Sequence, residues 1–177
     1  MKKQLHYSWV ICLIGTFVLF CCSGLVSSAF SMYLPYIRIA NNFSNTQANS
    51  LLTIRFVSGS LITFVIDRML RKLGAKRCMQ LALLCSLLGF ACYGIGGSYP
   101  VYALGAVIHG IAHSVGGMVT VSVLVSKWFI SQRNLAFGLC SAGSGMATII
   151  APPILTSIVE TTSLRTAFFT EALIISS

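Results

Sequence analysis

Acidic side chains are the scarcest chemical group in this 177-residue chain. It contains three acids, Asp67, Glu160 and Glu171, so catalysis by a pair of carboxylates is nearly excluded. The chain also lacks a glycine-rich phosphate loop, a GxSxG nucleophile motif and any CxxC pair. These absences argue against the common enzymes and metal centres. They predict a protein that is not an enzyme and that holds no cofactor or metal.

Charge of either sign is scarce as well. Charged residues make up 8% of the chain and hydrophobic residues 56%. No charge falls within residues 4–37, 78–126 or 134–159. A run of about 20 apolar residues crosses a bilayer as a helix, and the lipid core allows only helices or closed barrels to span it. Because the apolar runs are continuous rather than alternating, the sequence predicts an all-α, multi-pass membrane protein.

Six membrane-spanning segments are expected. We place them at about 8–36, 46–66, 77–97, 101–126 and 135–159, with a sixth run over 167–177. Eleven residues make about 16 Å of helix, roughly half the hydrocarbon thickness, so the sixth span is expected to be cut short. The chain is therefore expected to be one helical membrane domain, 1–177, from the N-terminal part of a longer protein.

Orientation follows from the positions of lysine and arginine, which favour cytoplasmic loops. With the N-terminus inside, nine such residues face the cytoplasm: Lys2, Lys3, Arg68, Arg71, Lys72, Lys76, Arg77, Lys127 and Arg133. Only Arg38 and Arg165 face outward. Basic loops beside anionic lipid headgroups account for the net charge of +9 without any nucleic-acid partner. We expect a plasma-membrane protein with a cytoplasmic N-terminus.

Arg55 stands out inside the second expected span. It precedes Asp67 by 12 residues, which places it about 18 Å along the helix from the cytoplasmic boundary. A charge at that depth costs at least ~3 kcal/mol and normally faces a bundle interior or an aqueous cavity. Arg55 is a candidate site for an anion or a coupling ion. The alternative is a structural arginine paired with a carbonyl or carboxylate.

His109 and His113 are four residues apart on the fourth expected span and so share one helix face. His113 lies about 21 Å from the cytoplasmic edge, close to the depth of Arg55. Imidazole suits proton exchange or hydrogen bonding to a substrate. The alternative is that both rings hydrogen-bond to neighbouring helices. Zinc is disfavoured because no third ligand lies at that depth.

The first expected span carries a small, mildly polar segment that includes Ser23 and Ser27. Helices in lipid associate through small residues, so close packing is one reading of this segment. The other is that Ser23 and Ser27 line a substrate cavity.

Three segments together resemble the major facilitator superfamily. Residues 67–77, DRMLRKLGAKR, resemble its cytoplasmic loop signature of an acid, an arginine, a glycine and a basic pair. Residues 128–153, WFISQRNLAFGLCSAGSGMATIIAPP, and residues 30–35, FSMYLP, are similar to its monocarboxylate and oxalate/formate-antiporter-like branch. The resemblance covers essentially the whole chain.

The resemblance implies a twelve-helix transporter in two six-helix halves, of which this chain would supply the N-terminal half and lack the C-terminal one. It implies secondary transport of a small organic solute by alternating access, with an organic anion as one candidate class. Arg55, His109, His113, Ser23 and Ser27 would form the substrate site. Asp67, Arg68, Lys76 and Arg77 would form a cytoplasmic conformational latch. The alternative is a non-transporting membrane sensor or assembly protein derived from a transporter half.

Overall fold

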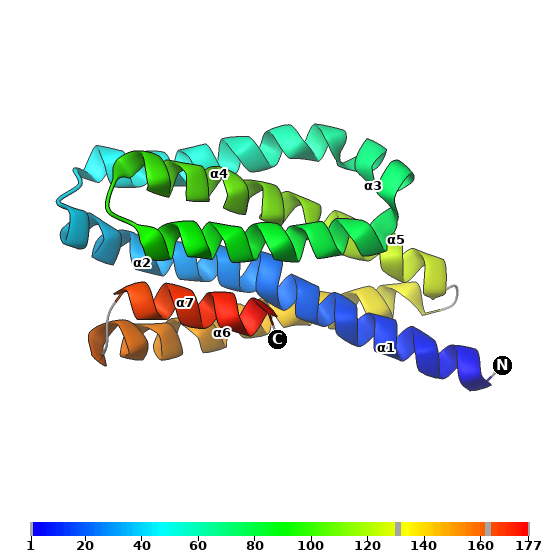
Figure 1. Ribbon diagram of the computed structural model, residues 1–177. Helices are drawn as coiled ribbons and strands as arrows, with labels where there is room; N and C mark the ends of the chain where they lie inside the picture. Colours follow the sequence, from blue (N-terminus) through cyan, green and yellow to red (C-terminus); the bar gives the residue numbers. More distant parts are fainter. Residues whose placement is uncertain (1, 130–131, 162–163, 177) are drawn as a thin grey trace.

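The computed structural model describes residues 2–129, 132–161 and 164–176, and all regular structure in these ranges is helical. The elements lie lengthwise beside one another in an elongated bundle (Figure 1). They are α1 (Lys2–Val18), the π-helix η1 (Leu19–Leu25), α2 (Val26–Asn41), α3 (Asn45–Ile95), α4 (Tyr99–Val115), α5 (Met118–Trp128), α6 (Arg133–Thr161) and α7 (Leu164–Ser176).

The first expected span is the centre of a longer rod in which α1, η1 and α2 follow one another without a break. We call these three elements the N-terminal rod. A π-helix inserts an extra residue into the helical repeat and is frequent at functional sites. Here it carries Ser23 and the buried pair Cys21 and Cys22. The rod ends at Asn42, whose left-handed backbone (φ 53°) closes the helix.

The cytoplasmic loop that the sequence predicts over 67–77 is not a loop in the structure. α3 contains both the second and the third expected span, and only Gly74 leaves the helical conformation, with φ 79° and ψ 158°. That backbone region is open essentially to glycine alone. Leu70 and Ala75 are buried on either side of it, so both arms keep packing up to the bend. The connection is therefore a sharp kink between two helical arms.

The start of α3 is fixed by its own sequence. Ser44 accepts a hydrogen bond from the Gln47 backbone N–H through Oγ (3.2 Å), and its own N–H donates to Gln47 Oε1 (3.0 Å). This reciprocal capping satisfies two backbone groups that the first helical turn would leave unpaired. It sets a sharp boundary after the short 42–44 turn.

The fourth expected span, 101–126, is broken into two helices. α4 ends where the Gly116 N–H bonds to the Ala112 carbonyl, and α5 begins after Gly117. Thr120 donates its hydroxyl to the carbonyl of Val115 at 2.6 Å, across the break. The break at Gly116 and Gly117 therefore lies within one membrane-spanning stretch, Tyr99–Trp128.

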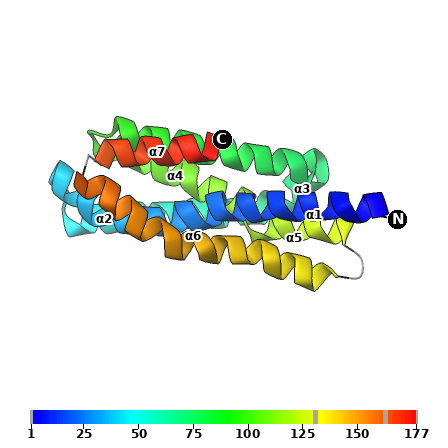
Figure 2. The ribbon, with the colours of Figure 1, turned by 90° about the horizontal axis from the view of Figure 1, so that it is seen from below.

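α3 packs most extensively against α4 and also contacts α7, while α6 runs along the N-terminal rod (Figure 2). Large apolar side chains cover the outside of the bundle, with Leu13 69%, Phe64 84% and Ile149 76% exposed. Four helical stretches in the described residues are long and apolar enough to cross a bilayer: Ser8–Asn41, Asn45–Ile95, Tyr99–Trp128 and Arg133–Val159. An apolar exterior of this kind suits lipid.

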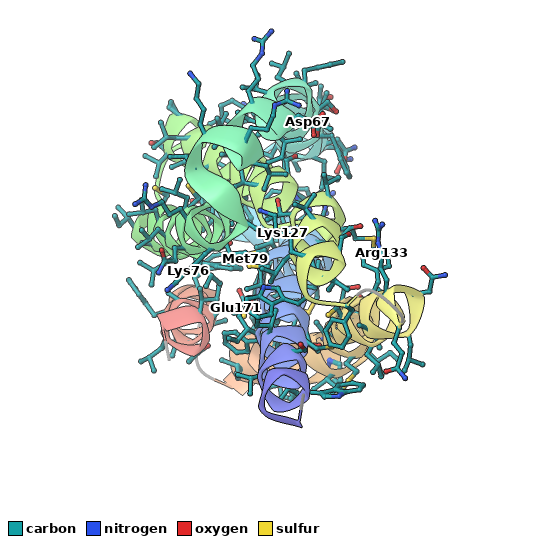
Figure 3. The ribbon with its side chains drawn as sticks, turned by 90° about the vertical axis from the view of Figure 1, so that its right-hand side faces the viewer. Asp67, Lys76, Met79, Lys127, Arg133 and Glu171 are labelled. Carbon is teal, nitrogen blue, oxygen red and sulfur yellow. The ribbon has the colours of Figure 1, made fainter. Side chains whose placement is uncertain are left out.

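Basic groups gather at one end of the bundle. Lys76, Lys127 and Arg133 lie at this end together with Asp67 (Figure 3), and α1 begins there (Figure 1). The short turns after α2 and α3 lie at the other end. The fold thus separates the groups that the sequence assigns to opposite sides of the membrane. Which end faces the cytoplasm stays a prediction.

Candidate functional site

Arg55 is a buried cation, 3% exposed, on the first arm of α3. Its Nη2 donates a hydrogen bond to Ser27 Oγ of α2 at 2.7 Å. Its Cζ lies 5.7 Å from the ring centroid of Phe30 and 5.5 Å from that of Phe56. No carboxylate pairs with it among the described side chains. One hydroxyl and two aromatic rings hold the guanidinium. Its other N–H groups are available to donate to a further acceptor.

A cavity of about 180 Å³, lined in part by Arg55, lies between α3 and α4. α3 lines it with Arg55, Ser60 and Thr63, and α4 with His113 and Ser114. Ser60 and Thr63 are exposed, whereas Arg55 is buried at its base. The structure thus brings Arg55 and His113 to one cavity rather than to opposite sides of the bundle. The residues that line the cavity thus include a cation, an imidazole and three hydroxyl groups.

The wall of this cavity depends on close contact between α3 and α4. A Cβ at Gly110 would overlap Ser58 Oγ and the carbonyl of Arg55, so only glycine lets the two backbones approach this far. Ser114 Oγ donates to the Gly59 carbonyl at 2.7 Å and ties the helices together next to the cavity. Small residues at such a contact are the usual basis of helix association in lipid.

His113 links the cavity to the N-terminal rod. Its Nδ1 lies 3.3 Å from the carbonyl of Cys22 in η1, and the ring is half-buried. A carbonyl only accepts, so this contact requires a proton on Nδ1. In the neutral ring, Nε2 is then an acceptor, and in the charged ring it is a donor. The imidazole is oriented by the π-helix.

His109 does not line the cavity, although it shares a helix face with His113. It is fully buried, and its Nε2 lies 3.2 Å from the Ser86 carbonyl. Phe90 and Tyr93 enclose the ring, with centroids at 4.4 and 4.9 Å. Its Nδ1 has no hydrogen-bond partner within the described part of the chain. His109 thus makes the hydrogen bond to a neighbouring helix that the structural alternative expects, and its part in substrate binding stays a prediction.

The two serine candidates, Ser23 and Ser27, have different surroundings in the structure. Ser27 holds Arg55 directly, so it positions the guanidinium. Ser23 lies half-buried in η1 and is not among the residues that line the Arg55 cavity.

The expected latch residues lie on both arms of the α3 kink. Asp67 and Arg68 precede Gly74, Lys76 and Arg77 follow it, and all four side chains are exposed. Lys76 also lines a cavity of about 370 Å³ against Ile11 of α1 and Trp128 of α5. A change in the kink would therefore move a charged side chain relative to two other helices.

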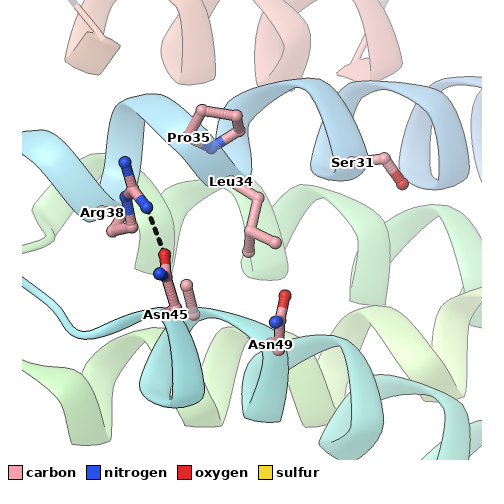
Figure 4. A pocket seen from close by; sticks show the side chains of 7 residues that line it. Ser31, Leu34, Pro35, Arg38, Asn45 and Asn49 are labelled. Carbon is pink, nitrogen blue, oxygen red and sulfur yellow. Dashed lines mark hydrogen bonds between the residues drawn. The ribbon is translucent and has the colours of Figure 1, made fainter.

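A further cavity of about 310 Å³ lies at the opposite end, between α2 and the start of α3 (Figure 4). Ser31, Pro35, Arg38 and Asn49 line it, and Arg38 donates to the side-chain carbonyl of Asn45. From the sequence, Arg38 is expected only to be a basic residue that faces outward. Its partner is supplied by the turn that brings α3 back beside α2.

Glu171 is a second ionisable residue that sequence reasoning passes over as a site. It points from α7 into the bundle (Figure 3) and is 0% exposed. The signal was present, because a carboxylate in the apolar run 167–177 is an intramembrane charge and calls for explanation. In the described part of the chain, no group of three or more metal-ligating side chains gathers around it or elsewhere.

These features define a class, that of multi-pass helical membrane proteins with a charged cavity between their helices. Residues 16–175 match the Major Facilitator Superfamily. The chain belongs to this superfamily, whose members carry small solutes across membranes. The match is to the superfamily as a whole and does not single out the monocarboxylate and oxalate/formate-antiporter-like branch. A search of curated proteins finds no match.

Proposed function

We propose that this chain takes part in secondary active transport of a small organic anion by alternating access. The observation that carries the proposal is Arg55. Arg55 is buried, has no carboxylate partner among the described side chains, and lines a cavity together with hydroxyls and an imidazole. An anion would supply the missing negative charge, and bonds from a guanidinium to a carboxylate are among the strongest hydrogen bonds in proteins.

The candidate residues differ in their part in this proposal. Arg55 binds the anionic group of the substrate, and Ser27 holds the guanidinium in place. His113 offers Nε2 to the substrate while the Cys22 carbonyl orients the ring. His109 supports the site from behind through Tyr93. Ser23 lies half-buried in η1, outside the lining of the Arg55 cavity, and has no direct part in substrate binding in this proposal.

Alternating access requires a part of the molecule that changes shape. We propose that the kink at Gly74 is this part, and that Asp67, Arg68, Lys76 and Arg77 stabilise one conformation through charge contacts made in that state alone. In the proposal a second six-helix half, which the resemblance to the superfamily implies, closes the cavity from the other side.

Uptake by the purified protein in liposomes tests the proposal, using a panel of carboxylates with amines and sugars for comparison. Arg55→Lys should lower carboxylate uptake about tenfold or more, because an ammonium cannot reproduce the two-pronged guanidinium contact. Arg55→Leu should abolish uptake while the protein still inserts. Arg71→Gln removes an exposed charge from the same helix and serves as the matched control.

Retained carboxylate uptake by Arg55→Leu would overturn the assignment of Arg55. Carboxylate binding that depends on Arg55, without any uptake, would favour the alternative of a membrane sensor.

A further inference from the structure

We infer that Glu171 is a proton-binding site, and that the proposed transport is coupled to the binding and release of one proton there. This inference rests on the proposed function for its role in transport. The proton site itself rests on the surroundings of Glu171 and can be tested without any substrate.

Glu171 lies on α7 in surroundings that offer its carboxyl no counter-charge. The side chain is 0% exposed, and neither carboxyl oxygen has a hydrogen-bond partner among the described residues. No described lysine, arginine or histidine forms an ion pair with it. A carboxylate cannot keep its charge in such surroundings without a partner, whereas the neutral acid can. The residue is therefore protonated in this conformation.

The titratable groups on the elements around Glu171 are few. From α2 it is Tyr33, which lies near the carboxyl and whose hydroxyl has no hydrogen-bond partner among the described residues. On α3, near the contact of Gly94 with Phe169 of α7, they are Cys92 and Tyr93. The described titratable groups of α6 are Arg133 and Cys140, which lie on its first half, far from the turn that leads into α7. Among the described side chains near Glu171, none is a cation at neutral pH.

Burial also means that the proton cannot exchange freely. The carboxyl has no exposed surface in this conformation, so water can reach it only after α7 moves relative to α2 or α3. Loading forms one O–H bond between a carboxylate oxygen and a proton from water, and unloading breaks that bond. Because each step needs a rearrangement of the helices, proton exchange is tied to the conformational cycle.

A chain of aromatic contacts joins this site to the Arg55 cavity. Phe30, beside Arg55, packs on Tyr93 with centroids 5.3 Å apart. Tyr93 packs on Phe168 at 5.6 Å, and Phe168 on Tyr33 at 4.6 Å. A shift of the Arg55 site on anion binding would be transmitted by these packed rings to the surroundings of Glu171.

Infrared spectroscopy of the reconstituted chain with ¹³C-carboxyl glutamate tests the inference directly. The chain has only two glutamates, Glu160 and Glu171, so an isotope-shifted band of a protonated acid can arise only from them. At neutral pH the wild type and Glu160→Gln should show this band, and Glu171→Gln should lack it. The wild-type spectrum alone overturns the inference if the band is absent, whether or not the variant folds.

A pH-sensitive dye inside the liposomes measures the coupling. Wild-type protein should move protons with a transported carboxylate. Glu171→Gln should lose this proton movement and keep substrate exchange at equal pH on both sides. Carboxylate uptake that is independent of the pH gradient, and equal in wild type and Glu171→Gln, overturns the coupling while the proposed function stands. If no anion is transported, but the infrared band is present in the wild type and lost in Glu171→Gln, the proposed function fails and the proton site is supported.

Discussion

Arg55 and Glu171 are opposite in charge type and lie inside the same bundle, yet they do not pair. Ser27 and two aromatic rings hold the arginine, while the glutamate lies beside a tyrosine and has no cation among the described side chains next to it. A direct ion pair would neutralise both groups and would remove the reason for either to bind anything. Their separation leaves one group available to an anion and the other to a proton.

The two histidines should respond differently to truncation. His109→Ala should lower the free energy of unfolding by about 2–4 kcal/mol, because it empties a fully enclosed site and removes the hydrogen bond to the Ser86 carbonyl. His113→Ala should cost only about 1 kcal/mol, since the ring is half-buried and makes one hydrogen bond. Urea unfolding in mild detergent measures both changes.

Substrate uptake per folded molecule separates the roles further. It should fall more for His113→Ala, which lines the cavity, than for His109→Ala, which does not. If His113→Ala destabilised the protein more and His109→Ala lowered uptake more, the structural and the substrate-binding role would have been assigned to the wrong histidines.

The α3–α4 pair is the element on which the cavity depends. Its two helices supply every described residue that lines the Arg55 cavity, and Gly110 sets their separation. The kink at Gly74 then divides α3 into an arm that carries Arg55 and an arm that carries Tyr93. The cavity and the aromatic contacts toward α7 are thus attached to different arms of one element.

Gly110→Ala should destabilise the protein by about 1–3 kcal/mol, because the added methyl group meets Ser58 and the Arg55 backbone. Gly138→Ala is the matched control. It lies in a helix with nothing within 4 Å of the added methyl group, and it should stabilise by about 0.5–1 kcal/mol through helix propensity. Thermal unfolding in detergent gives the comparison. Equal effects of the two substitutions would contradict the close α3–α4 contact.

Asp67→Asn should change the conformational equilibrium about fivefold and leave insertion unchanged, because the proposal gives its charge a partner in one conformation only. The measurement is the rate at which a thiol reagent labels Ser60→Cys at the exposed side of the Arg55 cavity. Arg71→Gln, another exposed charge change on the same helix, is the control. An unchanged labelling rate would count against a latch at Asp67.

At the scale of the whole molecule, the bundle has chemically different ends and an apolar middle. Lys76, Lys127 and Arg133 lie at the end where α1 begins (Figure 3). The opposite end carries the Arg38–Asn45 contact and its cavity (Figure 4). Lysine and arginine favour the cytoplasmic side, so the first end is expected inside the cell.

Cysteine labelling tests this orientation after the seven native cysteines are replaced. Lys72→Cys, beside the kink, should react with an impermeant maleimide only after the cells are opened. Gly97→Cys, in the turn between α3 and α4, should react in intact cells. Labelling of position 72 from outside would reverse the assignment.

The sequence alone determined the class of this protein, because charge-free apolar runs leave few alternatives to membrane-spanning helices. It also predicted that Arg55 and His113 lie at similar depth, since polar residues within an apolar run are visible without a fold and helix rise gives their depth. Their part in substrate binding stays a prediction. The sequence could not reveal that a single residue, Gly74, makes the bend, because a run such as DRMLRKLGAKR suits a loop as well as a helix.

Only the tertiary structure decided which residues share an environment. Helix periodicity places His109 and His113 on one face, but packing against Phe90 and Tyr93 buries the first and leaves the second at the cavity. Likewise, nothing in the order of residues places Glu171 beside Tyr33, far earlier in the chain. Contacts between distant helices depend on how their surfaces fit together, and that fit is a property of the folded bundle rather than of any one segment.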